Sequence, residues 1–145
     1  MNSAKTLDVW IVDDDASIRW VLERALRQAG LETRAFEQAD AALEALRQGA
    51  PDVLVTDIRM PGRSGLEMLE EIRAKRPRLP VIVMTAHSDL ESAVAAYQGG
   101  AFEYLPKPFD IDQAVELVRR AAAQGQRSES TVVESRRSPE LLGHA

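Results

Sequence analysis

Short runs of apolar, mostly β-branched residues alternate along this chain with longer segments in which apolar residues recur every three or four positions. Continuous apolar runs are typical of parallel strands covered on both faces, and the three-four spacing is typical of amphipathic helices. We expect strands at 9–12, 33–36, 53–56, 81–85 and 104–105. Helices are expected at 18–29, 39–48, 66–75, 90–98 and 111–123.

This alternation predicts an α/β fold, because each parallel strand returns to the same sheet through a right-handed helical crossover. The expected architecture is a doubly wound, five-stranded parallel sheet in the order 2-1-3-4-5 with five helices. All strands of such a sheet end at one edge, and ligands bind there, at the point where the strand order reverses. That point lies between the first and third strands.

Polar residues follow the predicted strands at this edge. Asp13 and Asp14 come after the first strand and Asp57 after the third, while Thr85 ends the fourth and Lys107 follows the fifth. Carboxylate oxygens are ligands that Mg²⁺ prefers, and an aspartate can act as a nucleophile toward phosphorus. A hydroxyl and an ammonium can bind phosphoryl oxygens. The pattern therefore predicts a site that holds a divalent cation and receives a phosphoryl group.

Neighbouring polar residues have structural explanations. Asp15 is placed to cap the N-terminus of the first helix. Ser88 and Glu91 match a capping box at the start of the fourth helix. His87 lies two residues after Thr85, but the chain has no cysteine and no histidine placed to complete a zinc site with it. The role of His87 stays open.

Composition narrows the class of protein. The chain has 145 residues, of which 45% are hydrophobic and 28% charged, as in an ordinary globular domain. The net charge of −5 disfavours direct binding to nucleic acid, which needs clusters of lysine and arginine. There is neither a signal-peptide pattern nor an apolar run of the roughly 18 residues that span a membrane. We therefore expect a cytoplasmic protein that makes no contact with membranes.

The chain divides into two parts. Residues 1–124 carry the strand and helix pattern, whereas residues 125–145 are rich in Gln, Arg, Ser and Glu and are expected to form a flexible linker. Leu141 and Leu142 are apolar and have nothing to pack against inside this tail. We expect that the chain was cut at the border of a further domain.

Four segments, in order and at matching spacing, resemble the receiver domains of two-component response regulators. They are 11–14 (IVDD), 57–62 (DIRMPG), 85–86 (TA) and 107–109 (KPF), and the similarity covers roughly residues 7–123. Within that family, segments 13–24, 84–89, 97–98 and 100–110 are most similar to regulators of nitrogen-dependent transcription. The resemblance implies a flavodoxin/CheY-like fold and a cis peptide bond between Lys107 and Pro108.

The resemblance also implies the chemistry of the site. Asp57 would accept a phosphoryl group from a sensor histidine kinase in a Mg²⁺-dependent reaction. The metal ligands would be Asp13, Asp14, Asp57 and the backbone carbonyl of Arg59. The domain would be a regulatory phosphoacceptor and not an enzyme, since it would catalyse only its own phosphorylation and slow dephosphorylation.

A switch is implied as well. Phosphorylation would draw Thr85 toward the phosphoryl group and let Tyr104 rotate inward. The surface formed by the fourth helix, the fifth strand and the fifth helix would then change and control an attached ATPase and DNA-binding output. The partner of that surface would be the output domain or a second receiver, and DNA would be bound only through a C-terminal domain that these residues do not include.

Two places on the predicted surface suggest contacts with partners. Trp20 lies off the apolar stripe of the first helix and near the active edge, where an exposed tryptophan is a typical interface anchor. We expect it to dock the kinase that donates the phosphoryl group. Leu90 and Val94 belong to a broad apolar surface on the fourth helix, and exposed apolar patches mark interaction sites.

Two other classes of protein share parts of this pattern. A Mg²⁺-dependent aspartyl phosphohydrolase is the alternative, but such enzymes usually carry a second carboxylate two residues after the nucleophile, where this chain has Arg59. They also need a cap over the substrate, for which no residues are left. A nucleotide-binding protein of flavodoxin type would need a phosphate-binding loop where this chain has three consecutive aspartates, Asp13, Asp14 and Asp15.

Overall fold

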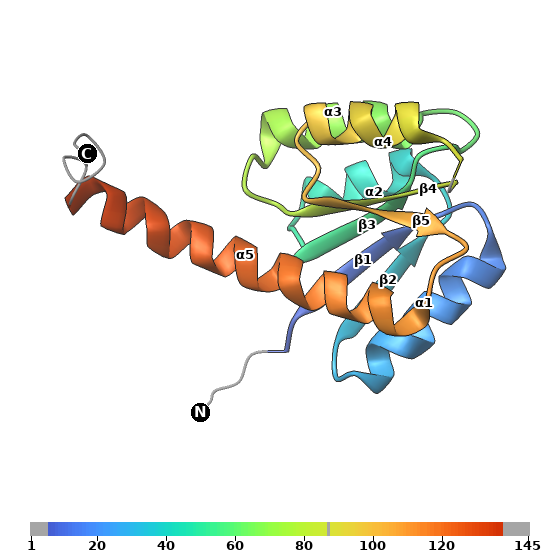
Figure 1. Cartoon of the computed structure of the whole chain (residues 1–145), viewed down its shortest axis with the longest axis horizontal. Coiled ribbons are helices and arrows are strands. Elements are labelled where there is room, and N and C mark those ends of the chain that lie inside the picture. The colour runs from blue at the N-terminus through green and yellow to red at the C-terminus, as the bar shows by residue number, and fades with distance from the viewer. Residues whose placement is uncertain (1–5, 87, 138–145) are drawn as a thin grey trace.

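The computed structural model describes residues 6–86 and 88–137, with the backbone alone for 126–137. Five parallel strands form one sheet in the order β2-β1-β3-β4-β5 (Figure 1), which confirms the predicted fold class and strand order. The strands are β1 (Asp8–Val12), β2 (Glu32–Phe36), β3 (Val53–Asp57), β4 (Val81–Ala86) and β5 (Glu103–Lys107). Each predicted strand is present, and the structure extends the first four by one residue and β5 by three.

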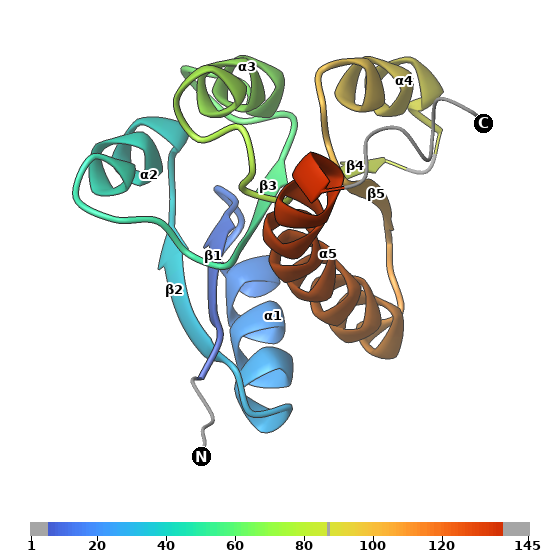
Figure 2. The same cartoon turned by 90° about the vertical axis from the view of Figure 1, so that its left-hand side faces the viewer.

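Helices cover both faces of the sheet. They are α1 (Ala16–Gln28), α2 (Ala39–Leu46), α3 (Gly65–Lys75), α4 (Leu90–Gln98) and α5 (Ile111–Arg137). Figure 2 shows α1 and α5 on one face of the sheet and α2, α3 and α4 on the other. In the part of the chain that the structure describes, no helix is both long and apolar enough to cross a membrane.

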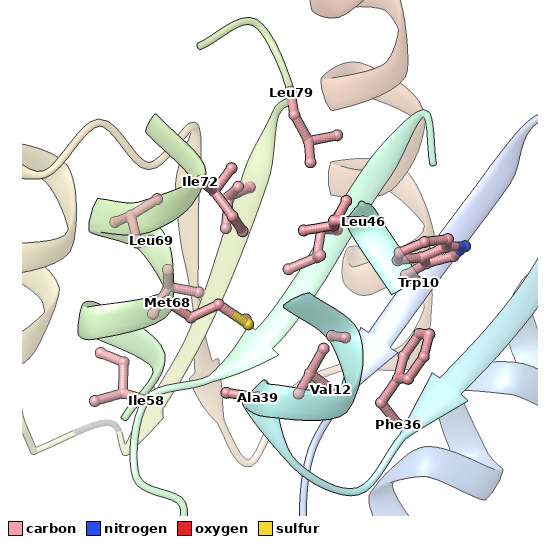
Figure 3. Packing of buried hydrophobic residues seen from close by; sticks show 14 of the residues in the cluster. Trp10, Val12, Phe36, Ala39, Leu46, Ile58, Met68, Leu69, Ile72 and Leu79 are labelled. Carbon is pink, nitrogen blue, oxygen red and sulfur yellow. The ribbon is translucent and has the colours of Figure 1, made fainter. Parts of the chain in front are cut away.

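Two hydrophobic layers hold the helices against the sheet. Because side chains alternate along a strand, β1 contributes Val9 and Ile11 to the layer beneath α1 and α5, and Trp10 and Val12 to the opposite layer. Figure 3 shows Trp10 beside Phe36 in this second layer, where the ring centroids are 5.1 Å apart. Trp10 therefore serves packing, as its place inside a strand predicts.

The predicted end of the fifth helix at residue 123 is wrong, because α5 continues to Arg137. The segment after Ala123 contains Gln, Arg and Glu residues, which have good helix propensity, so the helix need not end there. Figure 1 shows this part of α5 extending past the sheet. The linker role of residues 125–145 stays a prediction, and Leu141, Leu142 and His87 lie outside the described residues.

The capping box predicted at Ser88 is also wrong. The N-cap of α4 is Asp89, whose carboxylate accepts a hydrogen bond from the backbone N–H of Ser92 at 3.2 Å. A capping box is present instead at α3, where Ser64 and Glu67 each accept a hydrogen bond from the other's backbone N–H. At α1, Asp15 accepts hydrogen bonds from the first turn, as predicted.

Gly65 begins α3 in direct contact with the end of β3. A Cβ atom at this position would overlap the carbonyl oxygen of Asp57 and lie 2.9 Å from the Cα of Ile58. The N–H of Gly65 donates to the carbonyl oxygen of Ile58 at 2.8 Å. The segment between β3 and α3 is thus folded back tightly against the backbone of Asp57, and only glycine fits there.

We predict that Gly65→Ala lowers the free energy of unfolding by about 1–3 kcal/mol, because the added methyl group forces backbone atoms apart. Urea denaturation measures this change. Gly49→Ala is the matched control: a Cβ there meets no atom within 4 Å, so its effect should stay within about 0.5 kcal/mol. Equal stabilities of the two variants would contradict the close approach.

Candidate functional site

Three carboxylates meet at the edge where β1 and β3 end. Asp13, Asp14 and Asp57 each offer an oxygen, and these oxygens lie within 4.8 Å of one another. The side chains converge because β1 and β3 are paired neighbours, with Val12 opposite Thr56. Asp13 is fully buried, Asp57 is 7% exposed and Asp14 is exposed. The structure thus brings together the three acidic residues singled out by the sequence.

Lys107 reaches this cluster from the end of β5. Its Nζ lies 3.0 Å from Oδ2 of Asp13 and 3.3 Å from Oδ1 of Asp57. Burial disfavours the charged ammonium, but the two carboxylates outweigh burial and raise the pKa of Lys107 above its usual value. The peptide bond between Lys107 and Pro108 is cis.

Asp57 carries a charge that its surroundings disfavour. Burial raises the pKa of the Asp57 carboxyl group, and the negative charge of Asp13 raises it further, while the ion pair with Lys107 opposes both effects. The net direction is upward. One ammonium therefore does not fully compensate the carboxylates, and the site favours an additional positive charge.

Thr85 lies near the end of β4, the strand between β3 and β5. Its Oγ1 is buried and has no hydrogen-bond partner among the described residues. An unpaired buried hydroxyl costs roughly 1–3 kcal/mol, so Thr85 gains from any partner that reaches it. A hydroxyl at the same sheet edge as Asp57 and Lys107 is suited to binding a phosphoryl oxygen.

Tyr104 lies on β5 opposite Val83 and is half-buried, as its position on an edge strand predicts. Its ring packs edge-to-face against Tyr97 of α4, with the centroids 5.8 Å apart. The Tyr97 hydroxyl donates to the Glu103 carboxylate at 2.8 Å. Burial and this neighbouring carboxylate raise the pKa of Tyr97 to about 12, so its hydroxyl stays protonated at neutral pH.

The side chain of Arg59 has a partner that sequence analysis did not anticipate. Its Nη2 lies 2.8 Å from Oδ2 of Asp89, the N-cap of α4. Asp89 also accepts a hydrogen bond from the Ser92 hydroxyl at 2.7 Å. The segment that follows Asp57 is therefore tied to the start of α4, and no local sequence pattern signals a pair of residues so far apart.

The expected contact residues lie on the surface. Trp20 is 61% exposed, as predicted, and the guanidinium of Arg24 lies 5.3 Å from the centre of its ring. On α4, Leu90 is 64% and Val94 54% exposed. The helix packs on the sheet side through small residues, Ala93 and Ala96.

Comparison with known proteins agrees with this geometry. The response regulator receiver domain family matches residues 9–119. The chain is 64% identical over 118 residues to the DNA-binding transcriptional regulator NtrC of Escherichia coli K12, a match that covers 81% of this chain and 25% of that protein. NtrC of Bradyrhizobium is 40% identical over 116 residues. The chain spans about a quarter of the length of these relatives.

Solved structures agree as well. The BeF3-activated receiver domain of nitrogen regulatory protein C is 60% identical and superposes with a TM-score of 0.74, covering 85% of this chain and 99% of that one. NtrX from Brucella abortus in complex with ADP is 33% identical, with a TM-score of 0.84 over 88% of this chain and 30% of that one.

The fold and the site define a phosphoacceptor module, and the chain belongs to the response regulator receiver domain family. Its receiver is homologous to that of the nitrogen regulator NtrC. These findings confirm the predicted family and the similarity to nitrogen regulators, and the alternative of an aspartyl phosphohydrolase is not favoured.

We predict that Asp57→Asn stabilises the metal-free domain at neutral pH. The folded-state pKa of Asp57 is raised above the usual 3.8, so the folded protein holds this proton more tightly than the unfolded chain does. Stability is consequently lost as pH rises through the interval between the two pKa values, and an amide avoids that loss. Urea denaturation with a chelator should show a more stable variant at about pH 7 and convergence toward about pH 3.

The control for this measurement is Asp15→Asn, because Asn caps a helix about as well as Asp. Its stability at neutral pH should stay within about 0.5 kcal/mol of the wild type. An Asp57→Asn variant that is less stable than the wild type at neutral pH would show that the carboxylate stabilises the fold.

Proposed function

We propose that Asp57 accepts a phosphoryl group from a sensor histidine kinase. The observation that carries this proposal is the position of Asp57: its buried carboxylate lies among two other carboxylates, 3.3 Å from the Lys107 ammonium. The unpaired Thr85 hydroxyl at the same edge supplies a donor for the product. Phosphoryl transfer depends mainly on positioning and charge stabilisation, so these groups suffice.

Mg²⁺ fits the donor set of this site. It prefers hard oxygen ligands, and Asp13, Asp14 and Asp57 supply them within a space that suits one ion. The family resemblance adds the backbone carbonyl of Arg59. When bound, the ion would neutralise the charge that opposes the approach of a phosphoryl dianion.

In the proposed reaction, the Asp57 carboxylate attacks phosphorus, an O–P bond forms, and the N–P bond to the phosphohistidine of the kinase breaks. Lys107 then pairs with one phosphoryl oxygen and the Thr85 hydroxyl donates to another. The electron pair of the broken bond stays on the imidazole of the kinase. The product is an acyl phosphate on Asp57, and its slow hydrolysis resets the domain.

The surroundings support a regulatory phosphoacceptor and not a hydrolase. The position two residues after Asp57 holds Arg59, whose guanidinium pairs with Asp89 and offers no general acid. The domain would therefore catalyse only its own phosphorylation and slow dephosphorylation.

Thr85 and Tyr104 are the proposed switch. Phosphorylation would draw Thr85 toward the phosphoryl group, and Tyr104 would turn inward from its contact with Tyr97. Because α4 is anchored on the sheet by small residues, little apolar contact has to be broken for it to shift. The surface formed by α4, β5 and α5, with Leu90 and Val94 exposed on it, would then present a changed apolar patch.

The relatives suggest the wider context. They are named DNA-binding transcriptional regulators, and we propose that this domain likewise controls an ATPase and DNA-binding output in nitrogen regulation. Residues 1–124 would form the receiver and 125–145 the linker toward that output. The partner of the α4 surface would be the output domain or a second receiver. The protein would act in the cytoplasm and contact DNA only through its C-terminal part.

We predict that the domain forms one acid-stable, base-labile adduct with acetyl phosphate and Mg²⁺, and that Asp57→Asn abolishes it. Intact-protein mass spectrometry before and after mild base measures the adduct. Asp15→Asn is the matched control and should retain it, because it alters a neighbouring carboxylate outside the proposed ligand set. Turnover of many equivalents of acetyl phosphate, or full labelling of Asp57→Asn, would refute the proposal.

We predict that Trp20→Ala slows phosphotransfer from the cognate kinase about tenfold, since an exposed tryptophan anchor typically contributes more than 1 kcal/mol to docking. Labelling by acetyl phosphate, which needs no docking surface, should be unchanged. Rapid-mixing measurements with radiolabelled kinase give the first rate. An equal rate for variant and wild type would remove Trp20 from the interface.

A further inference from the structure

Arg19 binds the backbone of the loop that carries two of the proposed metal ligands. Its Nη1 donates to the carbonyl oxygen of Asp13 at 2.7 Å. Arg19 lies in the first turn of α1, and its side chain reaches back across the β1–α1 loop to the end of β1. The residue is half-buried, unlike Trp20 beside it.

This bond completes the hydrogen bonding of Asp13. Oδ1 accepts the backbone N–H of Asp15 at 2.9 Å, and Oδ2 pairs with Lys107. The carbonyl oxygen of Asp13 follows the last residue of β1, beyond the sheet ladder, and receives its donor from Arg19. Each of the three oxygens of Asp13 is therefore fixed by a different part of the fold.

The loop concentrates negative charge. It contains three consecutive carboxylates, and one of them, Asp14, is exposed. A hydrogen bond from a guanidinium is charge-assisted and so stronger than a neutral one, and its positive charge also offsets repulsion within the loop. Arg19 is the side chain that supplies both effects from within α1.

We propose that Arg19 is a positioning residue that holds the β1–α1 loop in the geometry in which Asp13 and Asp14 bind the divalent cation. This inference rests on the proposed phosphoacceptor function. Arg19 itself touches neither the cation nor the phosphoryl group. It acts through the backbone of Asp13.

Two effects of opposite sign follow from removing Arg19, and they make the inference testable. Loss of a nearby positive charge would by itself tighten cation binding. Because solvent screens the Arg19 charge, the Kd for the cation would fall by about threefold at most. Loss of the hydrogen bond from Arg19 would weaken cation binding, because Asp13 and Asp14 would then be more mobile before the cation binds. Ordering them on binding would raise the Kd for the cation by about tenfold or more. We expect the second effect to dominate.

The experiment is calorimetric titration of Mg²⁺ into the intact chain and its variants, at a temperature where circular dichroism shows each to be folded. Arg19→Ala should raise the Kd for Mg²⁺ about tenfold, and Arg19→Lys, which keeps the charge but not the planar donor, about threefold. Arg27→Ala is the control from the same helix, since Arg27 binds the side chains of Glu23 and Thr33. Its Kd should stay within about twofold of the wild type.

Phosphorylation by acetyl phosphate gives a second readout. Arg19→Ala should react slowly at low Mg²⁺ and recover the wild-type rate at saturating Mg²⁺, because the anchor affects ion binding and not the nucleophile. An unchanged or lower Kd would overturn the inference, and so would a lower melting temperature without a change in Kd. If Arg19→Ala does not fold, the Kd of Arg19→Lys decides in the same way. Failure of the wild type to bind Mg²⁺ would instead refute the proposed function.

Discussion

The repulsion among carboxylates at one edge of the sheet has to be balanced by the fold around them. Two unit charges about 5 Å apart repel by about 3 kcal/mol at the effective dielectric of a protein surface. Asp13 and Asp57 are buried at that range with a single ammonium, Lys107, between them. Burial and the charge of Asp13 raise the pKa of Asp57, and the Lys107 ammonium opposes them only in part. A bound cation would offset this repulsion, which is why the proposed phosphoacceptor reaction includes one.

The rest of the fold keeps these charges in place. Two apolar layers fix the relative positions of β1, β3 and β5, so that residues far apart in the chain meet at one edge. The approach of Gly65 to the Asp57 carbonyl holds the following segment against the end of β3. Arg19 does the same for the loop after β1. Packing thus provides the rigidity, and short polar contacts orient the side chains of the candidate site.

Two other contacts link the candidate site to the surface formed by α4, β5 and α5. Arg59 joins the segment after Asp57 to the N-cap of α4, and Tyr97 joins the last turn of α4 to β5. Between these two ties the helix rests on alanines, with larger apolar side chains facing outward. A helix held by a few polar contacts at its ends can adopt a second position when those contacts change. Phosphorylation would then shift an equilibrium between two packings of one surface.

Pattern and motif in the sequence were enough to predict the fold class and the strand order, which the structure confirms. They also singled out Asp13, Asp14, Asp57, Thr85 and Lys107 as candidate site residues. Apolar periodicity is local, and parallel strands always end at one edge, so both could be predicted without coordinates. Three contacts became visible only once the chain was folded. Lys107 pairs with Asp13, 94 residues away, and Arg59 pairs with Asp89, 30 residues away. Arg19 binds a backbone carbonyl. Such contacts depend on side-chain direction and on the packing of distant elements, which no local pattern records.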